Sequence, residues 1–204
     1  MLEYFIINKP FQVLSQFSPQ KGKLGLRDLY DLPVNHYPVG RLDYDSEGLL
    51  IITNDKALNH ALLNPLFAHE KEYWAQVEGE ISPEAIHNLQ QGVPITIDGK
   101  VYITRPSIAE KFSEAPRVAD RNPPVRFRKN IPTSWLRLAI TEGKNRQVRK
   151  MTAKTGYPTL RLIRYRIEKL TLEGLEPGGI RRIRREELFP LLGMDRGNRK
   201  IKTG

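Results

Sequence analysis

Apolar and polar positions alternate along much of the chain and predict a series of β-strands. In Glu72–Glu78 every second residue is apolar, which places Tyr73, Ala75 and Val77 on one face of a strand. The run Leu49–Thr53 is apolar almost throughout and indicates a buried strand. Similar patterns predict strands at Glu3–Asn8, at its antiparallel partner Phe11–Phe17, at Trp135–Thr141 and at Thr159–Ile167, and a hairpin at Ile95–Ile103.

Helical spacing with start and stop signals predicts three helices between these strands. One begins after Ser82, followed by Pro and Glu, and ends at Gly92. A second is capped by Asn54 or Asp55, and a third covers Asn145–Thr155. Strands outnumber helices and several pairings look antiparallel. The pattern therefore predicts an α+β fold with a mixed, mostly antiparallel sheet and flanking helices.

Composition excludes several classes of protein. The 204 residues contain no cysteine, which excludes disulfides, thiolate catalysis and Cys-based zinc sites. Four histidines are scattered without the spacing of metal ligands, so we expect no metal. No apolar run is long enough to cross a bilayer, and the N-terminus lacks the features of a signal peptide. These observations predict a cytoplasmic protein that does not associate with a membrane. We also expect a monomer.

Charge is distributed very unevenly along the chain. Residues 1–116 hold 10 Lys/Arg and 15 Asp/Glu, a net charge of −5, whereas residues 117–204 hold 23 and 8, a net charge of +15. Such a gradient indicates a polyanion bound by the C-terminal half. No basic amphipathic helix with bulky apolar residues opposite is present in the sequence, which favours nucleic acid over a membrane surface.

Two basic segments are candidates for that contact. The irregular segment 113–134 is rich in Pro and Arg, and a loop of this length in a compact domain is usually functional or disordered. We expect Arg126, Arg128 and Lys129 in it to bind the polyanion. In the third helix, spacing of 100° per residue brings Arg146, Arg149 and Lys150 together on one side.

Candidate chemistry is concentrated in Tyr37–Asn54. Residues 41–47 hold one cation and three carboxylates, followed directly by the buried strand. Residues 43–48 have the opening spacing of a calcium-binding EF-hand loop, but Asn54 stands where that loop needs a bidentate Glu. A calcium site is therefore disfavoured.

Three other kinds of site remain for these acids. A carboxylate pair for glycoside hydrolysis would leave the positive C-terminal half without a role. Phosphoryl transfer lacks a Gly-rich phosphate loop. The last alternative is one nucleophilic or general-base Asp in an enzyme acting on RNA, with the neighbouring acids structural.

A resemblance to a known family favours this last alternative. Residues 40–55, GRLDYDSEGLLIITND, resemble the signature of pseudouridine synthases acting on ribosomal RNA, in the branch whose motif begins Gly-Arg-Leu-Asp. Lys71-x-Tyr73 resembles the second motif of this branch, and residues 142–151, EGKNRQVRKM, resemble its third. Residues 160–164, LRLIR, resemble the segment that follows.

The resemblance implies a reaction and its catalytic residues. The family cuts the C1′–N1 bond of a uridine, rotates the base and joins C5 to C1′ without metal or cofactor. By resemblance, Asp43 is the catalytic aspartate, acting as a nucleophile at C1′ or as a base at C2′. A carboxylate in a dry pocket needs a nearby cation to stay ionised. Arg149 resembles the residue that forms a salt bridge with the catalytic aspartate in this family, and Arg146 is the alternative.

Other residues are implied to contact RNA. Tyr73 resembles the aromatic residue that stacks on the target uracil, and Leu162 the residue that packs beneath it. A uridine must leave its stack before it reacts, and Arg41 resembles the residue that fills the space left behind. We expect the full set of RNA-binding residues to be Arg41, Lys71, Arg126, Arg128, Lys129, Arg146, Lys150 and Leu162.

The resemblance also implies an organisation and a partner. We expect a pseudouridine synthase domain over 1–187, with lobes at roughly 1–62 and 63–187 around a central active-site cleft, and a basic tail at 188–204. The N-terminal S4-type RNA-binding domain of most branch members is not expected here. Residues 121–136 are similar to members acting on the large subunit. The expected partner is 23S ribosomal RNA or a large-subunit assembly intermediate. The alternative is an RNA-binding assembly factor with vestigial or secondary catalysis.

Overall fold

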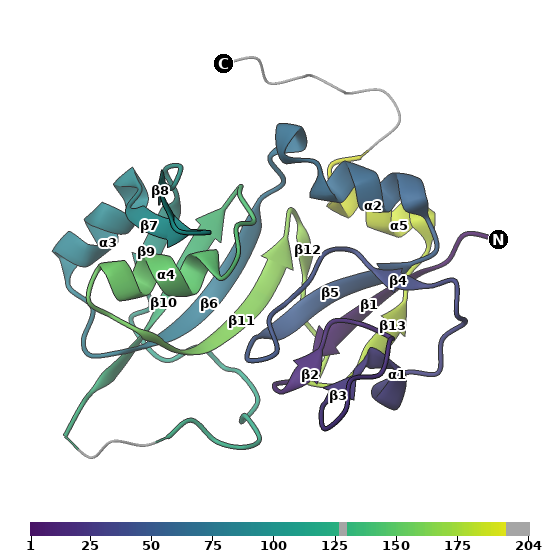
Figure 1. Cartoon of the computed structure of the whole chain (residues 1–204), viewed down its shortest axis with the longest axis horizontal. Coiled ribbons are helices and arrows are strands. Elements are labelled where there is room, and N and C mark those ends of the chain that lie inside the picture. Colours follow the sequence, from purple (N-terminus) through teal and green to yellow (C-terminus); the bar gives the residue numbers. More distant parts are fainter. Residues whose placement is uncertain (127–129, 195–204) are drawn as a thin grey trace. The chain divides into compact units, whose positions relative to one another are not determined.

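The chain forms two compact units, which are described separately below (Figure 1). The computed structural model describes residues 1–126 and 130–194. The first unit comprises 1–69 and the segment from Arg166 onward, and the second comprises 70–165. The fold is α+β, which confirms the predicted class. No helix within the described ranges is long and apolar enough to cross a membrane.

The division differs from the predicted lobes of 1–62 and 63–187. The chain returns to the first unit at Arg166, because strand β13 (Ile180–Arg182) pairs with β1 (Tyr4–Lys9) near the N-terminus. Helix α5 (Arg185–Leu191) crosses the predicted start of the basic tail at residue 188. The pairing of β13 with β1 has no local sequence signal, because the two strands lie more than a hundred residues apart in the sequence.

The sheet of the first unit is built around β1. This strand pairs antiparallel with β13 on one side and with β5 (Glu47–Thr53) on the other. All seven residues of β5 are buried, as its apolar run predicted. The remaining elements of this unit are β2 (Val13–Leu14), β3 (Leu24–Gly25), α1 (Leu26–Leu29), β4 (Tyr37–Pro38), α2 (Lys56–Leu63), the 3₁₀ helix η1 (Pro65–Phe67) and β12 (Leu170–Thr171).

The predicted strand Phe11–Phe17 is wrong. Only Val13–Leu14 is a strand, and it pairs parallel with β3 rather than antiparallel with β1. Gln12 has a positive φ of 57°, which turns the chain away after β1. The neighbour of β1 is instead β5, which lies much later in the sequence.

Helix α2 begins at the predicted cap. The Asp55 carboxylate accepts hydrogen bonds from the backbone N–H groups of Ala57 (3.0 Å) and Leu58 (3.1 Å). Its second oxygen accepts from the Tyr4 hydroxyl at 2.8 Å, which ties the helix to β1. Burial and this bond to Asp55 raise the pKa of Tyr4 to about 12, so the phenol stays neutral and remains a donor.

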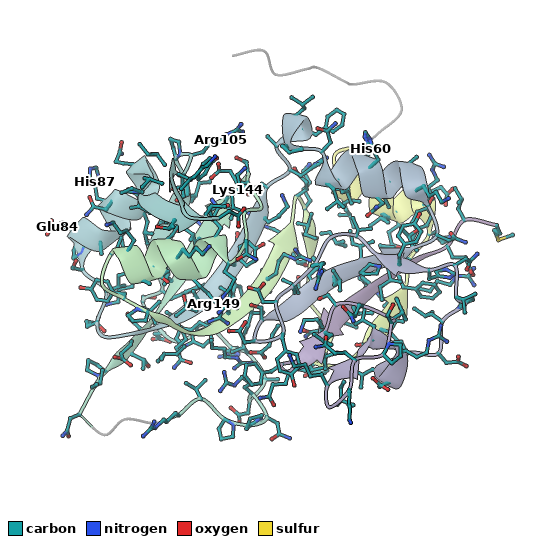
Figure 2. All side chains as sticks on the ribbon, in the orientation of Figure 1. His60, Glu84, His87, Arg105, Lys144 and Arg149 are labelled. Atoms are coloured by element: carbon teal, nitrogen blue, oxygen red, sulfur yellow. The ribbon has the colours of Figure 1, made fainter. Side chains whose placement is uncertain are left out.

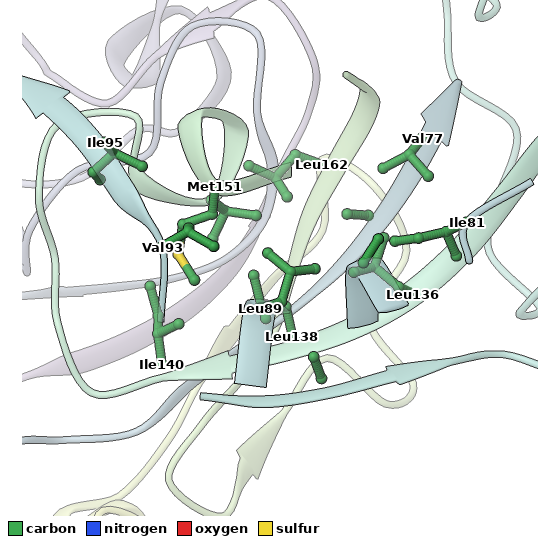
Figure 3. Packing of buried hydrophobic residues seen from close by; sticks show 14 residues of the cluster. Val77, Ile81, Leu89, Val93, Ile95, Leu136, Leu138, Ile140, Met151 and Leu162 are labelled. Carbon is green, nitrogen blue, oxygen red and sulfur yellow. The ribbon is translucent and has the colours of Figure 1, made fainter. Parts of the chain in front are cut away.

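The second unit contains a sheet in the order β11 (Thr159–Ile167, in this unit up to Tyr165), β6 (Lys71–Glu78), β10 (Thr133–Ile140) and β9 (Ile108–Lys111). Strands β6 and β10 pair antiparallel along their whole length. Their inward side chains, with those of helices α3 (Pro83–Gln91) and α4 (Gln147–Lys154), form one hydrophobic core that includes Leu89, Leu138, Met151 and Leu162 (Figure 3). Alternation in Glu72–Glu78 correctly placed Ala75 and Val77 in this core.

Local signals in the second unit are confirmed. The Ser82 hydroxyl caps α3 by accepting from the Ala85 N–H at 3.1 Å, and Gly92 ends that helix. The predicted hairpin is β7 (Pro94–Ile97) and β8 (Lys100–Ile103). Its two turn residues, Asp98 and Gly99, have φ of 48° and 78°, as a two-residue type I′ turn requires.

Tyr30 provides a test of the first unit's core. Its hydroxyl is buried and has no hydrogen-bond partner in the described part of the chain, and burial raises its pKa to about 12. The folded state favours the neutral phenol, so this stabilisation is complete below pH 10 and is lost as the pH rises towards 12. Tyr30→Phe should leave the free energy of unfolding at neutral pH unchanged or higher. Between neutral pH and pH 12 the wild type should lose about 2–3 kcal/mol more of this free energy than the variant, because only the wild type has this phenol to ionise. Urea unfolding of both proteins at neutral pH and between pH 10 and 12 measures this difference. An equal loss in both would contradict it.

Candidate functional site

The loop that carries Asp43 is tied down on both sides of this residue. Ser15 donates its hydroxyl to the Leu42 carbonyl at 2.8 Å and accepts from the Leu42 N–H at 3.0 Å. On the other side, the Tyr44 carbonyl accepts from the Gln12 N–H at 2.9 Å. The Asp43 carbonyl itself accepts from the Ser46 N–H at 3.0 Å, which closes a turn. Asp43 is partly buried, so its carboxylate sits on a held backbone and is still reachable.

Gly40 sets the approach of the chain to this loop. Its φ is +74°, a region that favours glycine, and a Cβ there would lie 3.0 Å from Cδ2 of Leu63 on α2. The next residue, Arg41, is exposed, so its guanidinium is available to a ligand. The structure therefore places Arg41 and Asp43 in one loop of the first unit, immediately before β5.

The three acids of the loop differ in environment. Asp43 and Asp45 are partly buried, whereas Glu47 is buried at the first position of β5. A buried glutamate inside a strand suits a structural role. The assignment of Asp45 and Glu47 as scaffold residues remains a prediction.

In the second unit, Tyr73 and Leu162 belong to the same side of the sheet. Tyr73 is partly buried against the hydrophobic core, and Leu162 is a buried member of that core. Helix α4 contributes Val148 and Met151 to it. The structure thus brings together the two side chains expected at the uracil and the helix that carries the third motif.

Contrary to the prediction from the sequence, the basic residues of the third motif do not all lie on one helix. Helix α4 begins at Gln147 rather than Asn145, because Arg146 has a φ of +51° and the Gln147 N–H bonds to the Lys144 carbonyl. Arg146 is exposed, while Arg149 and Lys150 are partly buried. Nη1 of Arg149, labelled in Figure 2, donates to the Thr159 carbonyl of β11 at 3.2 Å. The expected pairing of Arg149 or Arg146 with Asp43 remains a prediction.

The long segment between β9 and β10 is held by arginines. Arg121 donates to the carbonyls of Pro123 (2.8 Å) and Pro124 (3.0 Å), and Nη2 of Arg161 in β11 donates to the Ala119 carbonyl at 2.9 Å. Two of the arginines in and beside this segment therefore support its backbone. Arg126 is exposed, whereas Arg128 and Lys129 lie outside the described residues.

Lys71 lies at the first position of β6, opposite Ile140, and is partly buried. This placement distinguishes it from Arg41, Arg126 and Arg146, which are exposed. Its RNA-binding role remains a prediction.

Sequence reasoning missed a network around Glu142, the first residue of the third motif. Its buried carboxylate accepts from the Tyr102 hydroxyl, from the Arg105 backbone N–H at 3.0 Å and from Nε2 of Gln147 at 2.7 Å. The bond from Tyr102 is the main cause that raises the pKa of this tyrosine. No local pattern could reveal the network, because Tyr102 lies 40 residues before Glu142.

A metal ion would need several acidic or imidazole side chains that converge on one point. Across residues 1–126 and 130–194, no group of three or more His, Asp or Glu side chains is arranged to hold one.

The sequence of this chain is similar to those of known pseudouridine synthases. Residues 3–154 match the family model described as RNA pseudouridylate synthase. A ribosomal large subunit pseudouridine synthase E of Vibrio parahaemolyticus is 48% identical over 174 residues, covering 85% of this chain and 70% of that protein. The protein of the same name from Xanthomonas axonopodis pv. citri is 49% identical over 174 residues, covering 84% of this chain and 89% of that protein.

A solved structure shows the same fold. The crystal structure of a pseudouridylate synthase superposes with a TM-score of 0.74 at 24% sequence identity. The match covers 94% of this chain and 74% of that one.

Proposed function

The chain belongs to the RNA pseudouridylate synthase family, and on this premise we propose that it isomerises a uridine of large-subunit ribosomal RNA, with Asp43 as the reacting carboxylate. The observation that carries the proposal is the loop of Asp43, whose neighbours Leu42 and Tyr44 are both tied by hydrogen bonds within the region that matches the family. The ribosomal substrate is supported by the names of relatives that are 48% and 49% identical.

The reaction is an isomerisation that needs no cofactor. The C1′–N1 bond of the uridine breaks, the uracil rotates, and C5 bonds to C1′. The hydrogen on C5 leaves as a proton and N1 gains one, so atoms and charge balance. The Asp43 carboxylate acts on the ribose, either by bonding to C1′ or by taking a proton at C2′.

The other residues serve this step through binding. Tyr73 stacks on the extruded uracil and Leu162 packs beneath it, in agreement with their common place at the hydrophobic core. Arg41 enters the space that the uridine leaves. Arg149 provides the counter-charge of the aspartate. The RNA backbone is contacted by four basic residues, Lys71, Arg126, Arg146 and Lys150. A ribosomal RNA substrate also implies a cytoplasmic enzyme.

Tritium release tests the proposal directly. A 23S transcript labelled with tritium at C5 of its uridines should release label when the protein is added, since C5 loses its hydrogen in every turnover. A 16S transcript with the same label is the control and should release none. If neither naked transcript reacts, large-subunit assembly intermediates are the next substrate, and failure on these too would contradict the proposal.

A further inference from the structure

Several basic residues lie at the N-terminus of helix α4, which the helix dipole already makes partly positive. Lys144 and Arg146 precede it, and Arg149 and Lys150 lie in its first two turns. In the fully described stretch 142–155, the first turn of α4 holds no acidic residue, and no side chain caps its first backbone N–H groups. Cations at a helix N-terminus are unfavourable, whereas an anion there is stabilised. This arrangement therefore favours an anionic ligand.

Glu142 is the nearest acid in the sequence, and its oxygens are already engaged below the surface. They accept from Tyr102, from the Arg105 N–H and from Gln147. This buried carboxylate connects β8, the segment after β8 and the first residue of α4. Its role is thus to join these segments rather than to occupy the surface.

This connection holds two further basic residues, Arg105 and Lys144, close to the same tyrosine–glutamate pair. Nζ of Lys144 lies 4.9 Å from the centre of the Tyr102 ring, whose hydroxyl binds Glu142. Nε of Arg105 lies 4.0 Å from the same carboxylate, and the Arg105 side chain is 58% exposed. Arg105 and Lys144 are both labelled in Figure 2. Two exposed cations from segments 39 residues apart are therefore anchored on one tyrosine–glutamate pair.

We propose that Arg105 and Lys144 form a phosphate-binding site for the backbone of the substrate RNA, positioned by Tyr102 and Glu142. The inference rests on the proposed function and names an additional contact of that RNA. A guanidinium binds phosphate through two parallel N–H groups, and a lysine adds a point charge. Arg146 extends the site towards the start of α4.

The double variant Arg105→Ala/Lys144→Ala tests the site. Its Kd for the 23S transcript at low salt should rise by roughly tenfold. The slope of log Kd against log salt should fall by about one to two, because fewer counterions are released. The rate of tritium release at saturating RNA should stay at the wild-type value.

A matched control removes the same two charges elsewhere in the unit. Lys111 on β9 pairs with Glu80, and Arg137 on β10 pairs with Glu110. Lys111→Ala/Arg137→Ala should change neither Kd nor salt slope appreciably. Wild-type binding by Arg105→Ala/Lys144→Ala, or an equal loss in the control pair, would overturn the proposal.

Tyr102→Phe separates positioning from direct contact. The variant keeps the ring beneath Lys144 but loses the hydroxyl that binds Glu142, so Kd should rise by a few-fold with an unchanged rate at saturating RNA. A lower rate with unchanged Kd would place the pair in the chemistry instead and contradict the RNA-binding role. The two proposals fail separately: a wild-type protein that binds RNA through this site but releases no tritium would refute only the proposed function.

Discussion

Asp43→Asn is expected to lower tritium release from a labelled 23S transcript by about 10⁴-fold or more, the scale on which enzymes lose activity when the reacting residue is removed. An amide has nearly the size of a carboxylate but neither attacks C1′ nor takes a proton from C2′. The measurement is the single-turnover rate with enzyme in excess over RNA, so that binding does not limit the result.

The loop should survive this substitution. The hydrogen bonds described above for this loop use backbone groups and the Ser15 hydroxyl, none of which the substitution changes. Unfolding by urea should therefore be close to that of the wild type. The control is Asp45→Asn, which makes the same charge change two residues away and should keep most of the activity.

The pair of variants also decides between an enzyme and an assembly factor. An enzyme predicts that Asp43→Asn binds RNA normally and is inactive while Asp45→Asn is active. Equal release by the wild type and by Asp43→Asn, on RNA that both bind, would refute a catalytic role for Asp43.

Leu138→Ala is expected to lower the free energy of unfolding by about 3 kcal/mol, within the range for buried leucines. Leu138 is completely buried in the core of the second unit (Figure 3) and lies opposite Tyr73 in the β6–β10 register. Removing most of its side chain leaves a cavity that the surrounding strands and helices fill only partly. A loss of this size corresponds to a decrease in Tm of about 6–12 °C for a chain of this length.

An exposed leucine provides the control for the core. Leu66 is 88% exposed, so Leu66→Ala should change stability by less than about 0.5 kcal/mol. Urea and thermal unfolding of the three proteins measure both values. Equal stability of Leu138→Ala and the wild type would show that this position does not support the core. Because Tyr73 packs against the same core, Leu138→Ala should also weaken RNA binding.

Local structure was largely predictable because its causes lie within a few residues. Asp55 and Ser82 cap helices through their own side chains, and Asp98-Gly99 closes a hairpin through the φ values it tolerates. The prediction failed where a partner outside the segment decides the structure. Phe11–Phe17 has the composition of a strand, but β1 pairs with β5, and the turn at Gln12 leaves only Val13–Leu14 extended.

By itself, the sequence determined the α+β class, the buried strand after the acidic loop and the family, because alternation, caps and motifs are read along the chain. Only the tertiary structure decided what surrounds these residues. It tied the Asp43 loop to Ser15 and Gln12, returned the chain to the first unit at Arg166, and connected Tyr102 to Glu142. Such contacts join residues that are distant in sequence, and their energies depend on burial and direction, which no local pattern encodes.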